Sequence, residues 1–208
     1  TAFPHVALPL ARPCIVVAGM GRCGTSLMMQ MLAAGGVPCT GEWPAFESDI
    51  ALIRRFDAAA FDALGDCAVK LVDPAPLKPG RLPNHVVIWL DRSVPQQARS
   101  QIKFLRWNNF PVQETRQTRR AFETGLRTSR MGHRLSLGVP GRTPSIAIAF
   151  ETILAYPART ARDIAAFLAL HGWAALDVAA MAREVVPRSA DCYPGMMELE
   201  LLVARGMA

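Results

Sequence analysis

A glycine-rich loop near the start of the chain has the residue types of an anion-binding site. Residues 19–26 read Gly-Met-Gly-Arg-Cys-Gly-Thr-Ser, after the apolar run 14–18 and before an amphipathic stretch that begins at Leu27. A strand, a tight glycine turn and a helix N-terminus direct several backbone N–H groups at one place, where the helix dipole also favours negative charge. The loop therefore predicts a site for phosphate or a chemically similar group.

The spacing of this loop is that of a Walker A motif, but the position of the motif's lysine holds Thr25. The usual cation on the β- and γ-phosphates of ATP is therefore missing, and Arg22 inside the loop is the obvious replacement. Asp91 ends an apolar run, as the aspartate of a Walker B motif does. A P-loop kinase that binds Mg²⁺ through Ser26 and Asp91 is thus one hypothesis.

From Arg22 to Leu27 the chain resembles the sulfotransferase family, whose phosphosulfate loop has Arg or Lys, a small residue, Gly-Thr, Thr or Ser, and an apolar helix. The resemblance implies that the donor is 3′-phosphoadenosine 5′-phosphosulfate (PAPS), that the product is adenosine 3′,5′-bisphosphate (PAP), and that no metal is needed. The loop residues it implies for donor binding are Gly21, Arg22, Cys23, Gly24, Thr25 and Ser26.

Arg92 and Ser100 form a second motif of this family. Arg92 comes just after the apolar run 86–90, and Ser100 lies eight residues further on. Sulfotransferases hold the 3′-phosphate of the donor with an Arg at a strand end and a Ser eight residues later. An Arg fork suits this task because it donates two parallel hydrogen bonds to phosphate oxygens. The resemblance therefore implies that Arg92 and Ser100 bind the 3′-phosphate.

Glu42 and Lys70 are candidate catalytic residues, together with Arg22. The segment 39–42, Cys-Thr-Gly-Glu, is similar to a part of the tyrosylprotein sulfotransferases in which a Glu is the catalytic base, and this role carries over to Glu42. A carboxylate can take the proton of an acceptor hydroxyl. Lys70 lies in the strand-like run 68–72, where a buried Lys needs a partner. The resemblance implies that Lys70 and Arg22 neutralise charge on the transferring group.

The resemblance covers about residues 14–170, and its motifs are most similar to those of tyrosylprotein and of bacterial or Golgi-type sulfotransferases. It implies a PAPS-dependent enzyme that moves a sulfuryl group to a hydroxyl. The acceptor class stays open between phenol, sugar and peptide tyrosine. Pro187-Arg188 could add a basic contact to the nucleotide. A sulfotransferase-like module that binds but does not catalyse is a further hypothesis.

The elements that must position these residues alternate along the chain. Strand patterns at 14–18, 68–72, 86–90 and 146–150, and a short one at 37–40, are separated by helical patterns at 25–34, 50–64, 95–106, 112–134 and 161–170. This order predicts an α/β protein, a three-layer P-loop-type fold with a mostly parallel sheet and helices on both faces. We expect one sulfotransferase-like domain over residues 1–208. His85 precedes its strand and should lie at the edge opposite the loop, so it is not expected to be the base.

Composition excludes several classes of protein. Hydrophobic residues make up 51% of the 208 residues and charged residues 19%, which indicates a globular chain with a substantial core. The five cysteines form no CxxC pair, which argues against a disulfide framework or a thiolate zinc site and favours a reducing, cytoplasmic location. No apolar run is long enough to span a membrane. The net charge of +6 predicts an affinity for anions, but the Arg-rich segment 112–134 has only one Phe, Tyr or Trp residue, Phe122, among its arginines, so nucleic acid is not expected as a partner.

Overall fold

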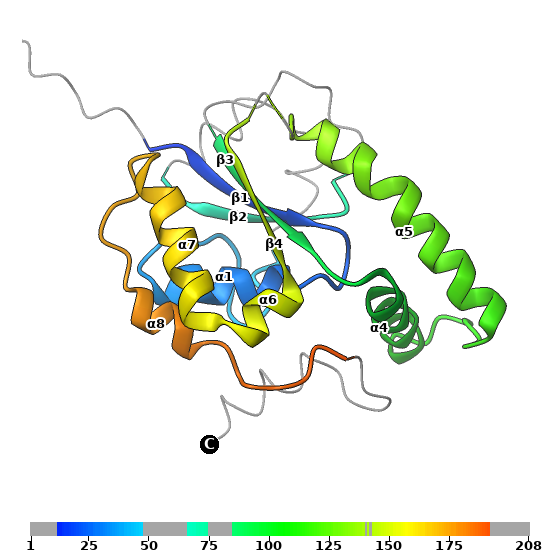
Figure 1. The fold of residues 1–208 in the computed structure, drawn as a ribbon. Helices are drawn as coiled ribbons and strands as arrows, with labels where there is room; N and C mark the ends of the chain where they lie inside the picture. The colour runs from blue at the N-terminus through cyan, green and yellow to red at the C-terminus, as the bar shows by residue number, and fades with distance from the viewer. Residues whose placement is uncertain (1–11, 48–65, 75–84, 140, 142, 192–208) are drawn as a thin grey trace, which may run out of the picture.

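A computed structural model describes residues 12–47, 66–74, 85–139, 141 and 143–191 of the chain. One sheet of four parallel strands forms its centre, in the order β2-β1-β3-β4 (Figure 1). The strands are β1 (Cys14–Gly19), β2 (Ala68–Val72), β3 (His85–Asp91) and β4 (Ser145–Ala149). The expected parallel sheet is therefore confirmed.

The central strands are buried along their length because both of their faces are covered. All six residues of β1 are buried, as are the five residues of β3 between His85 and Asp91. A strand that is buried on both faces reads as a continuous apolar run, without alternation of polar and apolar residues. This explains why these two strands were the most evident in the sequence.

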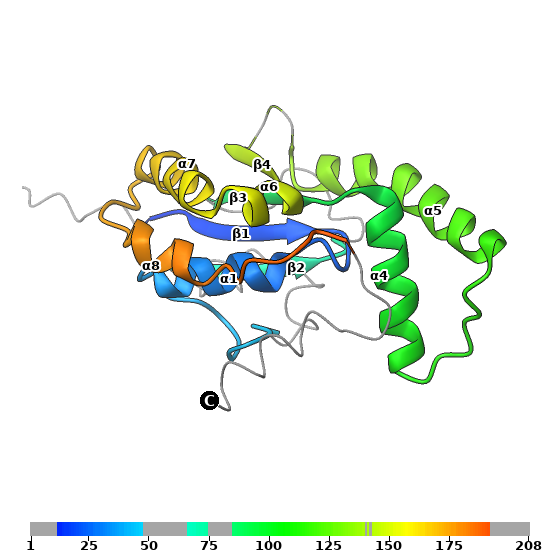
Figure 2. The same cartoon turned by 60° about the horizontal axis from the view of Figure 1, so that its bottom comes forward.

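Helices connect the strands and pack around the sheet. They are α1 (Thr25–Ala34), α4 (Val94–Trp107), α5 (Arg116–Ser136), α6 (Phe150–Ala155), α7 (Pro157–Ala169) and α8 (Val178–Arg183). Figures 1 and 2 both show α4 and α5 together at one end of the sheet, away from α7 and α8. None of the helices in the described ranges is both long and apolar enough to cross a membrane.

Two apolar clusters lie on the two faces of the sheet. On one face, Ile15 and Ile88 pack with residues of α1, α6, α7 and α8. On the other face, Val16 and Trp89 pack with Leu137 and Val139, which directly follow α5. The coverage of both faces confirms the expected layered α/β arrangement.

Helix α5 is held to the sheet by two of its arginines. The Nε atom of Arg130 lies 3.3 Å from Oδ1 of Asp91 at the end of β3, and Arg134 lies 4.0 Å from the other carboxylate oxygen. The Nη2 atom of Arg130 also donates to the carbonyl of Arg92 and to Oε1 of Gln97, at 3.0 Å each. Part of the Arg-rich segment therefore anchors α5 to the sheet and to α4.

Some expectations differ from the structure in detail. In place of the short strand expected at 37–40, the structure has a single parallel bridge between Cys39 and Ala68, made by hydrogen bonds from Thr40 N to Ala68 O and from Ala68 N to Pro38 O. Phe150 begins α6 instead of ending β4, and α8 was not predicted. The helix expected at 50–64 lies outside the described residues. His85 does begin β3, at the edge of the sheet opposite the loop.

The anchoring of α5 gives a first prediction. Arg130→Ala removes a partly buried ion pair and two further hydrogen bonds, so it should lower the free energy of unfolding by about 1–3 kcal/mol. Arg127→Ala on the same helix is the matched control, because Arg127 forms a surface ion pair with the neighbouring Glu123 and its loss should cost less than about 1 kcal/mol. Urea unfolding of both variants measures this, and equal losses would contradict the anchoring role.

Candidate functional site

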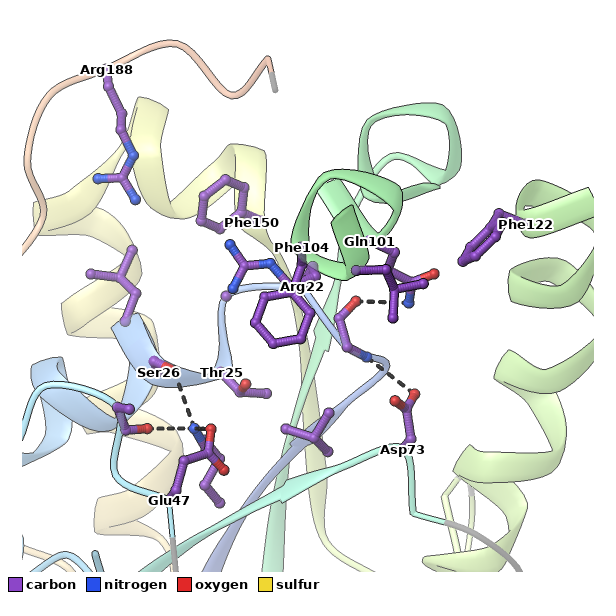
Figure 3. Close-up of a pocket in the computed structure, with 17 residues that line it drawn as sticks. Arg22, Thr25, Ser26, Glu47, Asp73, Gln101, Phe104, Phe122, Phe150 and Arg188 are labelled. Atoms are coloured by element: carbon purple, nitrogen blue, oxygen red, sulfur yellow. Dashed lines mark hydrogen bonds and ion pairs between the residues drawn. The ribbon is translucent and has the colours of Figure 1, made fainter. Parts of the chain in front are cut away.

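The glycine-rich loop, residues 19–24, lies at the edge of the sheet where the parallel strands end. A cavity of about 620 Å³ opens there, beside the end of β2 and the start of α1 and against one face of α4 (Figure 3). Its lining consists of Gly21, Arg22, Gly24, Thr25, Ser26, Leu27, Ala45, Glu47, Lys70, Val72, Asp73, Gln101, Phe104, Leu105, Phe122, Phe150 and Arg188. Three of these side chains are cationic and two are carboxylates. The balance suits an anionic ligand.

Two glutamines of α4 bind the carbonyl groups of the loop. The Nε2 atom of Gln97 donates to the carbonyls of Met20 and Gly21, both at 2.9 Å, and Nε2 of Gln101 donates to Gly21 O at 3.0 Å. Gln97 and Gln101 are four residues apart and therefore lie on the same face of the helix. The loop carbonyls are thus satisfied by α4 on the side that faces this helix.

Asp73 holds the other side of the loop. Its Oδ1 atom accepts a hydrogen bond of 3.1 Å from the N–H of Gly21, and its own N–H donates to Gly19 O at 3.0 Å. Asp73 and Gln101, both labelled in Figure 3, thus bind the N–H and the carbonyl of Gly21. The first glycine turn of the loop is therefore fixed from β2 and from α4 together.

Arg92 lies behind the loop and is 2% exposed. Its Nη1 atom donates to the carbonyl of Arg22 at 3.1 Å and its Nη2 atom to the carbonyl of Ala190 at 3.0 Å. The guanidinium lies over the ring of Phe150, 4.5 Å from its centre. Arg92 thus connects the loop to a segment almost one hundred residues further along the chain, and it does not line the cavity.

Arg22 is the cation that the loop itself supplies. Its φ angle of 70° lies in the left-handed region, and its Nε atom donates to Oγ of Ser100 at 3.2 Å. Its guanidinium also lies 5.3 Å from the ring centre of Phe104. Ser100 is 3% exposed and, like Arg92, does not line the cavity. Arg22 is therefore bound twice: Ser100 accepts from its side chain and Arg92 donates to its backbone carbonyl.

The start of α1 brings hydroxyl groups to the cavity. Thr25 and Ser26 form its first turn, and the preceding Gly24 has no side chain to cap the helix. Gly24 has φ 100°, and a Cβ atom there would lie 2.6 Å from the ring of Phe150. The loop therefore needs glycine here both for its backbone conformation and for the approach of Phe150.

Cys23 packs inside the loop and is fully buried. A Cβ atom on Gly19 would lie 2.4 Å from its sulfur, so the thiol fills the space that this glycine leaves. Burial, followed by the nearby Asp91 and Asp73 carboxylates, raises the pKa of Cys23 to about 12. The side chain is therefore a neutral thiol at physiological pH and supports the loop by packing.

Lys70 lies in β2, with 4% of its surface exposed, and reaches the start of α1. Its Nζ atom donates to Oγ of Ser26 at 3.2 Å and also contacts the carbonyl of Ala45 and Oε1 of Glu47. Burial lowers the pKa of Lys70, and the contact with Glu47 opposes this shift. The pairing explains how a lysine is accommodated in a buried parallel strand.

The structure groups most of the residues that the sequence singled out. Gly21, Arg22, Gly24, Thr25, Ser26 and Lys70 line one cavity, and Cys23, Arg92 and Ser100 lie buried beside it. Arg188 also lines it. Glu42 is exposed and is not part of the lining. Within the described ranges, no group of three or more His, Cys, Asp or Glu side chains is placed to hold a metal ion.

The sequence motifs assigned no binding role to several other lining residues. Glu47 and Asp73 carry the two carboxylates of the cavity, while Phe104 and Phe150 give it apolar walls. The spacing of Gln97 and Gln101, four residues apart just after a strand end, was a signal available in the sequence. Nothing in the sequence alone showed which carboxylate would reach Lys70.

Solved structures of sulfotransferases share this fold. Sulfotransferase STF9 from Mycobacterium avium matches with a TM-score of 0.55 and 14% identity, over 85% of this chain and 68% of that chain. Mouse sulfotransferase SULT7A1, complexed with PAP, matches with a TM-score of 0.54 and 17% identity, over 82% and 62% of the two chains. A sulfotransferase from Alicyclobacillus acidocaldarius matches with a TM-score of 0.50 and 19% identity, over 95% and 93%.

These matches confirm the expected P-loop-type α/β fold, and they identify it as the fold of the sulfotransferases. At identities below one fifth, the likeness is one of fold. The chain spans 62% of the mouse enzyme's length. No protein-family profile and no curated protein matches the sequence.

The geometry of the loop predicts that Gly24 cannot be replaced. Gly24→Ala forces a Cβ atom into a left-handed conformation and against Phe150, so it should destabilise the fold by more than about 1 kcal/mol. Gly132→Ala is the control, because a Cβ atom at this exposed position of α5 meets nothing within 4 Å and should stabilise by about 0.4–1 kcal/mol. Thermal and urea unfolding report both changes, and a neutral Gly24→Ala would contradict the described loop.

Proposed function

We propose that this protein transfers a sulfuryl group from PAPS to the hydroxyl group of an acceptor. The observation that carries the proposal is the grouping of Arg22, Ser26 and Lys70 around one cavity at the phosphate loop. The PAP bound to the mouse enzyme supports PAPS as the donor, since PAP is what PAPS becomes when it loses its sulfuryl group.

Each group of the cavity has a role in this proposal. The N–H groups of the loop and of the first turn of α1 bind the 5′-phosphate, with Thr25 and Ser26 as hydroxyl donors. Arg22 and Lys70 neutralise charge on the sulfuryl group and on the bridging oxygen as the bond to sulfur breaks. We assign contacts with the nucleotide to Arg188 and Phe150, because both line the cavity and a guanidinium and a ring can contact phosphate and base.

Arg92 and Ser100 remain the proposed partners of the 3′-phosphate. Both contact Arg22 and lie buried beside the cavity, and their bonds to Arg22 keep a guanidinium and a hydroxyl in fixed places. We propose that the 3′-phosphate accepts hydrogen bonds from Arg92 and Ser100, in addition to the bonds that these two residues make with Arg22. The base is a carboxylate of the turn formed by residues 41–47, to which the sequence candidate Glu42 belongs.

Two contacts disfavour the alternative of a Mg²⁺-dependent kinase. Ser26 would have to bind the metal ion, yet the ammonium of Lys70 already lies 3.2 Å from its hydroxyl. Asp91 would be the second metal ligand, yet its carboxylate accepts from Nε1 of Trp89 at 3.0 Å and pairs with Arg130. A dication beside Lys70 would be repelled, so the sulfotransferase hypothesis fits these residues better.

Two further expectations from the sequence remain predictions: that residues 1–208 form one sulfotransferase-like domain, and that the protein is cytoplasmic.

Binding of PAP tests the choice of donor. In a calorimetric titration, the affinity for PAP should exceed the affinity for 5′-AMP or ADP by about 10- to 100-fold. The reason is that hydrogen bonds between charged groups and the 3′-phosphate are worth about 1.5–3 kcal/mol. Addition of Mg²⁺ should leave the affinity for PAP unchanged. Equal affinity for 5′-AMP, or Mg²⁺-dependent binding of ATP that exceeds binding of PAP, would overturn the proposal.

The role of Arg22 gives a separate prediction. Arg22→Ala should lower the rate of PAP release from PAPS more than it lowers the affinity for PAP, since its charge acts chiefly on the sulfuryl group, which PAP lacks. Arg188→Ala should instead weaken binding of both nucleotides. Single-turnover rates and calorimetry separate the two effects. If both variants lost rate and affinity in the same ratio, this division of roles would be wrong.

A further inference from the structure

We propose that Glu47, and not Glu42, is the general base of the reaction. This inference rests on the proposed function and names the residue that takes the acceptor proton. It is carried by a chain of three contacting groups at the phosphate loop: the carboxylate of Glu47, the ammonium of Lys70 and the hydroxyl of Ser26 (Figure 3).

The position of Glu47 gives it access to both partners of the reaction. One of its oxygens contacts Nζ of Lys70, whose side chain is only 2% exposed, while the side chain of Glu47 itself is 57% exposed. Its carboxylate therefore joins the buried cation of the site to the part of the cavity that is open to solvent. A base needs this arrangement, because the donor lies in the loop and the acceptor must enter from outside.

Lys70 also allows a carboxylate to lie near an anionic donor. A carboxylate beside phosphate and sulfuryl oxygens is repelled unless a cation lies between them. Lys70 contacts both Glu47 and Ser26, so its ammonium lies between the carboxylate and the first turn of α1. The same cation that neutralises the transferring group thus compensates the charge of the base.

The turn formed by residues 41–47 is built to hold Glu47 in place. Gly41 has φ 77°, and a Cβ atom on it would lie 2.6–2.8 Å from backbone atoms of Phe46 and Glu47. Phe46 is 6% exposed and anchors the end of the turn in the core. The Nε2 atom of Gln30 donates to the carbonyl of Pro44 at 2.7 Å, which ties the middle of the turn to α1.

The other carboxylates near the site are less suitable. Glu42 pairs with Glu47 across the turn through a backbone bridge, but its side chain is exposed and does not line the cavity. Asp73 lines the cavity, but its carboxylate already accepts the N–H of Gly21 and so holds the loop. The pair Gly41-Glu42 resembles the family motif. In this chain its backbone packs against Phe46 and Glu47 and so fixes the turn in which Glu47 lies.

The transfer step is balanced as follows. The acceptor oxygen forms a bond to sulfur while the bond between sulfur and the bridging oxygen breaks. The bridging oxygen keeps the electron pair and leaves as part of the 5′-phosphate of PAP, beside Lys70. The proton of the acceptor hydroxyl passes to an oxygen of Glu47, and it leaves to solvent through the exposed side of that carboxylate.

Substitution of the two glutamates tests the inference. Glu47→Gln keeps the size of the side chain and a hydrogen-bond partner for Lys70, so the affinity for PAP should stay within about threefold while PAP release from PAPS falls by roughly 10²- to 10⁴-fold. Glu42→Gln should keep most of this rate. The rates are measured with a phenol, a tyrosine peptide, a monosaccharide and water alone as acceptors. The rise of the rate with pH on the acid side should be present in the wild type and lost in Glu47→Gln.

Further variants and outcomes distinguish a base from a merely structural residue. Gly41→Ala should displace the turn and lower the rate with little change in PAP affinity, whereas Glu114→Gln, a surface carboxylate paired with Arg106, should change neither. The inference is overturned if Glu42→Gln loses the rate while Glu47→Gln retains it, or if Glu47→Gln loses PAP affinity as strongly as rate. A wild type that does not bind PAP, or that binds PAP but does not release it from PAPS, would instead overturn the proposed function.

Discussion

The site depends on one constraint: the carbonyl groups of the phosphate loop must be bound by the protein, so that the loop's N–H groups can face a ligand. A buried carbonyl without a partner costs about 1–3 kcal/mol, and a short loop cannot satisfy its own carbonyls through helix or sheet bonds. Gln97, Gln101 and Arg92 supply the missing donors. The loop is therefore formed by β3 and α4 as much as by its own sequence.

This dependence connects the distant parts of the fold to the site. Arg92 binds both the loop and the carbonyl of Ala190, and Arg130 of α5 donates to the carbonyl of Arg92. The Arg-rich helix α5 thereby supports the loop through Arg130, and it also lines the cavity through Phe122. These contacts therefore help to fix the conformation in which the loop meets a ligand.

The sequence was sufficient to predict the parts of the site that are formed by residues adjacent along the chain. The run of apolar residues in β1, the glycines of the loop and the first turn of α1 are neighbours along the chain, so their geometry follows from local rules. The contact between Glu47 and Lys70 joins residues 23 positions apart through a turn set by Gly41 and Phe46. No local pattern encodes that turn, and the family motif directed attention to Glu42 instead. Helix α8 was missed because six residues are too few to show a helical period.

The rate at which the buried thiol of Cys23 reacts can report how often the loop opens. An alkylating reagent attacks the thiolate, and both the burial of Cys23 and its high pKa keep this form rare while the loop is closed. Modification must therefore wait for a local opening that exposes the sulfur, so the reaction rate follows the free energy of that opening and not the intrinsic reactivity of cysteine. A bound anion that holds the loop amides together would slow this labelling, so the rate at which Cys23 is alkylated reports whether the ligand is bound.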